Sequence, residues 1–63
     1  MSDNGSRTLV IVPAWNESKN VGNSVREILD ATSGLDVVVV DDGSTDDTAA
    51  VAAGAGARVV SLP

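Results

Sequence analysis

Three short apolar runs, separated by longer polar segments, constrain the fold of this chain most. The runs are Thr8–Val12, Val37–Val40 and Arg58–Leu62. The first two are rich in β-branched residues and almost wholly apolar, which is typical of strands covered on both faces of a sheet. Each gap has room for a crossover helix. The pattern predicts an α/β protein of the order β-α-β-α-β, with parallel strands and right-handed crossovers, which is half of a doubly wound fold.

Both gaps between the runs carry helix signals. In the first gap, four apolar residues follow the spacing i, i+4, i+7 and i+8 of an amphipathic helix, and Gly34 suits its end. These residues are Val21, Val25, Ile28 and Leu29. The second helix is predicted over residues 48–53, preceded by Ser44 and Asp47 at the spacing of a capping box. Pro13 is predicted to end the first strand.

Length and composition exclude several classes of protein. With 63 residues and no Cys or His, the chain has no disulfide or zinc framework. Its net charge of −5 argues against a nucleic-acid partner. It has neither a run approaching the roughly 20 apolar residues of a membrane span nor a signal peptide, so we expect a cytoplasmic protein. A chain this short is expected to be an incomplete domain over residues 7–63, after a disordered tail at 1–6.

The chemistry is expected at the carboxyl ends of the strands, where open α/β sheets bind their ligands. Pro13–Glu17 follows the first apolar run, and Asp41–Ser44 follows the second. If these two strands are neighbours, the segments lie side by side. An acid directly after the second strand is where nucleotide-binding folds hold ribose hydroxyls or a base N–H, because a carboxylate only accepts hydrogen bonds.

Each candidate residue also has a purely structural interpretation. Trp15 could anchor the core of a chain with no other aromatic residue, and Glu17 could be a favourable charge at a helix start. The pair Asp41–Asp42 could form a capped turn, although two adjacent carboxylates repel each other. Asp46–Asp47 is interpreted only as a pair of acids at the start of the second helix.

Val10–Glu17, followed by Val37–Asp46, resembles the amino-terminal part of family 2 glycosyltransferases. Within that family it is most similar to the polyprenol-phosphate branch, the enzymes like dolichol-phosphate mannose synthase. The resemblance covers Leu9–Leu62. It implies a partial, truncated GT-A fold of Rossmann-like type, in an enzyme that transfers a sugar from a UDP- or GDP-sugar to a polyprenyl phosphate or another acceptor.

The resemblance also implies a role for each candidate residue. The proline and the aromatic residue border the base, the glutamate approaches the nucleotide, and the valine lines the same pocket. The second aspartate accepts a hydrogen bond from the base or ribose, and the first braces the loop or contacts the ribose from farther away. These residues are Pro13, Trp15, Glu17, Val40, Asp42 and Asp41. Trp15 stands where tyrosine is more frequent.

Neither a catalytic residue nor a metal ligand is expected within these 63 residues. The resemblance implies a divalent cation, Mg or Mn, held by an Asp-x-Asp motif that this sequence does not contain. The chain by itself is therefore expected to be inactive, and missing downstream regions would bring the enzyme to the cytoplasmic face of the membrane. Two alternatives stay open: a receiver-like domain whose acidic pair binds a metal, and an inactive truncated binding module.

Overall fold

A computed structural model describes residues 8–31 and 34–63 of the chain. It contains β1 (Thr8–Ala14), α1 (Val21–Ala31), β2 (Leu35–Asp42), α2 (Thr48–Gly54) and β3 (Arg58–Leu62). The three strands form one parallel sheet in the order β1-β2-β3. This confirms the predicted β-α-β-α-β order, while the tail predicted at residues 1–6 lies outside the described residues.

Two strands run farther than the apolar runs predicted. β1 continues through Pro13 to Ala14, so the prediction that Pro13 ends the strand is wrong. β1 pairs only with β2 in the described sheet, and an edge strand tolerates a proline because one side of it needs no ladder hydrogen bonds. β2 continues into Asp41 and Asp42, which therefore lie on the pleat of a strand instead of in a turn.

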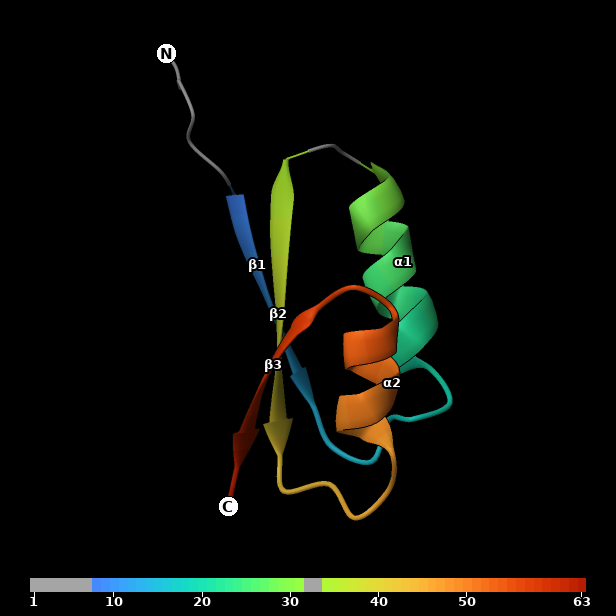
Figure 1. Ribbon diagram of the computed structural model, residues 1–63, viewed down its shortest axis with the longest axis vertical. Coiled ribbons are helices and arrows are strands. Elements are labelled where there is room, and N and C mark those ends of the chain that lie inside the picture. Colours follow the sequence, from blue (N-terminus) through green and yellow to red (C-terminus); the bar gives the residue numbers. More distant parts are fainter. Residues whose placement is uncertain (1–7, 32–33) are drawn as a thin grey trace.

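Both helices cover the same face of the sheet, as expected when two right-handed crossovers run in the same direction (Figure 1). The core lies between this face and the helices. Its buried apolar residues are Ala14, Val21, Val25, Val37, Val39 and Ala52. Gly22 lets the helices approach closely, because a Cβ at this position would lie 3.1 Å from Val51 Cγ1. None of the helices in the described ranges is long and apolar enough to span a membrane.

The opposite face of the sheet carries apolar side chains that no described element covers. Side chains alternate between the two faces along a strand, so residues out of phase with the core project to this side. The strongly exposed ones are Leu9, Ile11, Val60 and Leu62. The described residues thus form a two-layer structure in which only one sheet face is packed.

Candidate functional site

The carboxyl ends of β1 and β2 lie side by side. The strands pair in parallel, with Pro13 opposite Val40 and Ala14 opposite Asp41. The segment that leaves β1 and the segment that leaves β2 therefore emerge from the same edge of the sheet, at its lower end in Figure 1. This confirms the expectation on which the predicted site depended.

Hydrogen bonds join the loop after β1, residues 15–20, to the loop after β2, residues 43–47. The Asn16 N–H donates to Ser44 Oγ at 2.8 Å, and the Thr45 N–H donates to Asn16 Oδ1 at 2.8 Å. Asn16 has a positive φ of 50°, which asparagine tolerates better than most residues. These contacts make the two loops, called the paired loops below, into one surface.

A second set of hydrogen bonds joins the paired loops through the start of α2. The Glu17 N–H donates to Thr48 Oγ1 at 2.8 Å, and the Ser18 N–H donates to Asp46 Oδ2 at 3.2 Å. On the other carboxylate oxygen, Asp46 Oδ1 accepts the Thr48 N–H at 3.0 Å and the Thr48 hydroxyl. The hydrogen bonds from Thr48, together with those from Ser18, lower the pKa of Asp46 from its ordinary value of 3.8 to about 2.

This arrangement corrects the capping box predicted from Ser44 and Asp47. α2 begins at Thr48, its N-cap is Asp47, and the Asp47 side chain makes no capping hydrogen bond. The Ser44 hydroxyl instead accepts the Asn16 N–H. The spacing of Ser44 and Asp47 predicts a cap. Instead, the Ser44 hydroxyl binds an N–H of the neighbouring loop, and Asp46 accepts the Thr48 N–H.

The two adjacent aspartates project to opposite faces of β2. Asp41 is buried on the helix side, 6 % exposed, and its Oδ1 accepts the Ser44 N–H at 3.1 Å. Asp42 is exposed. Gly43, which follows with a φ of +73°, turns the chain in a conformation that other residues rarely adopt. Asp41 therefore braces the turn, while the Asp42 carboxylate stays accessible at the rim of the sheet.

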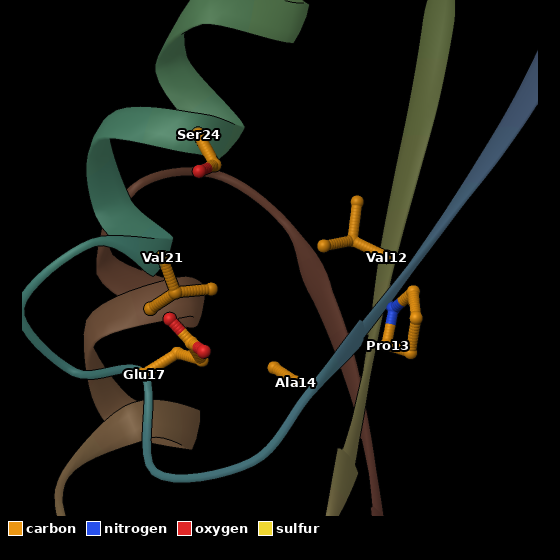
Figure 2. Close-up of a pocket in the computed structure, with 6 residues that line it drawn as sticks. All are labelled: Val12, Pro13, Ala14, Glu17, Val21 and Ser24. Carbon is orange, nitrogen blue, oxygen red and sulfur yellow. The ribbon is translucent and has the colours of Figure 1, made fainter.

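The predicted site residues do not gather in one pocket. A hollow of about 90 Å³ lies between β1 and α1, and Pro13 and Glu17 are among the residues lining it. Figure 2 shows the Glu17 carboxylate turned into this space, while the Pro13 ring lies on the other side of β1 from Ala14. Pro13, Val40 and Asp42 share the sheet face away from the helices, as strand alternation requires.

Trp15 is not a core residue. Its side chain is 62 % exposed, at the start of the loop that follows β1. The interpretation of Trp15 as the anchor of the core is therefore wrong, and the packing relies on valines and alanines instead. An exposed indole beside a strand end offers a flat apolar surface to a ligand.

The donor set of this edge does not fit a metal ion. No group of three or more Asp, Glu, His or Cys side chains that could hold one occurs within residues 8–31 and 34–63. Asp41 and Asp42 face opposite sides of the strand, so they cannot act as a pair of ligands to one cation.

Sequence reasoning missed the residues that join the loops. Asn16 and Ser44 lie in the two predicted segments but have no predicted binding role, Thr48 lies outside these segments, and Asp46 is interpreted only as an acid at a helix start. The available signal was weak: several short polar side chains follow two strand ends, and such side chains readily bond to backbone amides. Which amide each one reaches depends on the register of the two strands.

Comparison with known proteins assigns the chain to a family. Residues 9–63 match the family model described as glycosyl transferase family 2. A 4,4'-diaponeurosporenoate glycosyltransferase from Staphylococcus aureus is 45 % identical over 53 residues, which cover 84 % of this chain but 14 % of that relative. The chain thus spans only about a seventh of the curated relatives it matches.

Solved structures agree with this result. Glucosyl-3-phosphoglycerate synthase from Mycobacterium tuberculosis, in complex with Mg²⁺ and uridine diphosphate, is 42 % identical and superposes with a TM-score of 0.76. The match covers 89 % of this chain and 21 % of that one. The same synthase in complex with Mn²⁺, UDP-glucose and glycerol 3-phosphate gives the same TM-score. The described fold is thus part of a GT-A fold, and the chain belongs to glycosyl transferase family 2.

Proposed function

We propose that this chain is the amino-terminal, nucleotide-sugar-binding part of a glycosyltransferase, over residues 7–63. The observation that carries the proposal is the surface formed by the paired loops and the carboxyl ends of β1 and β2, called the rim below. The Asp42 carboxylate is exposed on this surface. The complexes of the related synthase with uridine diphosphate and UDP-glucose support the proposal.

The chemistry of the rim suits a nucleoside diphosphate sugar. Pro13 and Val40, opposite each other on one sheet face, offer an apolar edge, and Trp15 offers an exposed ring. Uracil and guanine both carry ring N–H donors, and the exposed Asp42 carboxylate is an acceptor that forms charge-assisted hydrogen bonds. We propose that these residues hold the base or ribose and that Glu17 approaches the same nucleotide from the helix side.

The reaction itself needs groups that this segment does not supply. The related synthase was solved with Mg²⁺ or Mn²⁺, and we propose that the intact enzyme also uses a divalent cation, with ligands outside the described residues. The part of this chain in catalysis is to bind and orient the donor, so that an acceptor oxygen attacks its anomeric carbon and the nucleoside diphosphate leaves as the bond from that carbon to the diphosphate oxygen breaks. For the isolated chain, the interpretation as an inactive binding module stays a prediction.

A more specific proposal concerns the acceptor of the sugar and the branch of the family to which the enzyme belongs. From the sequence resemblance we propose a lipid phosphate such as polyprenyl phosphate, at the cytoplasmic face of a membrane. The relatives' names point elsewhere, to diaponeurosporenoate and to 3-phosphoglycerate. Assays of the intact enzyme with these three acceptors would decide between them.

The receiver-like alternative is wrong, because the family match and the opposed aspartates both contradict it.

The test of the proposed function is Asp42→Ala in the intact enzyme. Losing a hydrogen bond to a charged group costs about 1.5–3 kcal/mol, so the donor KM should rise by at least about tenfold. Asp30→Ala is a matched control, because Asp30 is an exposed acid in the last turn of α1, away from the rim.

Titration calorimetry with UDP and with GDP on the same proteins would identify the base. If Asp42→Ala and Trp15→Ala both bind UDP and GDP as tightly as the unaltered enzyme, the rim is not the nucleotide site and the proposal is overturned.

A further inference from the structure

One carboxylate connects the two loops of the rim. Asp46 receives hydrogen bonds on both of its oxygens: the Ser18 N–H at 3.2 Å on Oδ2, and the Thr48 amide and hydroxyl on Oδ1. Ser18 belongs to the loop after β1, and Thr48 is the first residue of α2. Asp46 thus bridges segments that are 28 residues apart in the sequence.

The bridge extends to Glu17 through Thr48. The Thr48 side chain is completely buried, and its hydroxyl accepts the Glu17 N–H at 2.8 Å while donating to Asp46. A hydroxyl that donates to a carboxylate has its lone pairs free for an incoming N–H, so the Asp46 carboxylate orients Thr48 toward Glu17. Asp46 therefore fixes two consecutive backbone positions of the first loop, Glu17 indirectly and Ser18 directly.

We propose that Asp46 is a positioning residue that holds the Glu17 end of the first loop in place for the nucleotide-sugar. This inference rests on the proposed function, because it concerns the same rim. Glu17 lines the hollow between β1 and α1, and its carboxylate turns into that space (Figure 2). The direction of that side chain depends on the backbone that Asp46 and Thr48 hold.

Asp46→Asn is the informative substitution because both carboxylate oxygens face donors. Asparagine keeps the size of the side chain but offers one acceptor oxygen and one NH2 group. Whichever way the amide is turned, its NH2 group faces either the Ser18 N–H or the donors of Thr48. Asparagine must therefore lose either the hydrogen bond from the Ser18 N–H or the one from the Thr48 N–H. The lowered pKa of Asp46 agrees with a carboxylate that is charged and held by these donors at neutral pH.

The matched control is the neighbouring acid. Asp47 is exposed and its side chain makes no capping hydrogen bond, so Asp47→Asn removes the same charge at the same end of α2 without touching the bridge. Asp46→Glu is a second variant: it keeps the charge but moves the carboxylate outward by one methylene. If the position of the carboxylate matters more than its charge for holding the first loop, Asp46→Glu should have the same effect on donor KM and on amide exchange as Asp46→Asn.

The experiment uses the intact enzyme and measures donor KM, kcat and amide hydrogen exchange. In Asp46→Asn the donor KM should rise about tenfold while kcat changes by less than about threefold, the signature of weakened binding. The Ser18 and Glu17 amides should exchange faster, while the amides of β2 keep their protection. Asp47→Asn should match the unaltered enzyme in all three measurements.

The outcomes separate this inference from the proposed function. If Asp42→Ala raises the donor KM but Asp46→Asn and Asp46→Glu do not, the rim binds the nucleotide and the positioning role is overturned. Equal effects of Asp46→Asn and Asp47→Asn also overturn it, because they indicate a general effect of charge. A loss of protection throughout β2 in both Asp46 variants overturns it as well, since Asp46 would then support the fold as a whole. If neither Asp42→Ala nor Trp15→Ala weakens the binding of UDP or GDP, the proposed function itself is overturned.

Discussion

Replacing Thr48 by valine should release the first loop of the rim without changing the packing around α2. The side chain is completely buried and valine has nearly its shape, but valine cannot accept the Glu17 N–H, now bound at 2.8 Å. An unsatisfied buried donor costs about 1–3 kcal/mol. The bond is only partly buried and Asp46 is exposed, so water will compensate in part and we expect about 1–2 kcal/mol. That corresponds to a roughly 5- to 30-fold change in the opening equilibrium.

Amide hydrogen exchange measures this opening where it occurs. The Glu17 amide should exchange roughly 5- to 30-fold faster in Thr48→Val, in proportion to the opening equilibrium. Thr48→Ser is the control, because it keeps the hydroxyl and loses only a methyl group, so Glu17 should exchange within about threefold of the original rate. The Val39 amide in β2 serves as an internal reference. An unchanged Glu17 rate in Thr48→Val, or equal rates in the valine and serine variants, would refute this reasoning.

Two further predictions concern pH and the chain by itself. The Asp46 carboxyl, with its pKa lowered to about 2 by the hydrogen bonds from Thr48 and Ser18, should titrate near pH 2 in carbon NMR. Its contribution to stability should be complete above about pH 4 and lost as the pH falls toward 2, and a midpoint at the ordinary 3.8 would contradict this. The 63-residue chain alone should melt without a sharp transition or should self-associate, because Leu9 and Ile11 are 56 % and 60 % exposed on the uncovered sheet face. A cooperative melt that does not depend on concentration, measured by circular dichroism and by sedimentation, would argue against that prediction.

Much of the fold follows from the sequence because strand and helix signals are local. Apolar runs of β-branched residues marked all three strands, and the apolar stripe marked α1. The strand ends were harder to predict. Pro13 is a breaker in most strands but fits an edge, and whether β1 is an edge depends on the sheet order. Asp41 and Asp42 are unfavourable in strands by composition, yet the pairing with β1 and β3 extends over them.

The candidate site was predictable in place but not in detail. Parallel pairing of β1 with β2 was enough to bring the two motifs together. The contacts between the loops were not predictable, because each depends on a conformation set by residues far away in the sequence. Asn16 illustrates this: its positive φ aims its N–H at Ser44 while its side chain accepts from Thr45. Nothing in the local sequence distinguishes such an asparagine from one that caps a helix.

Strand geometry gives the two adjacent aspartates different surroundings and therefore different roles. Because β2 continues through both residues, Asp41 faces the helices and Asp42 faces away from them. Asp41 is occupied by the Ser44 amide and thereby holds the turn that presents Ser44 to Asn16. The Asp42 carboxylate does not brace the turn in this way, and it stays exposed. The first aspartate therefore holds the turn and the second stays accessible, and this difference supports the proposed role of Asp42 in nucleotide binding.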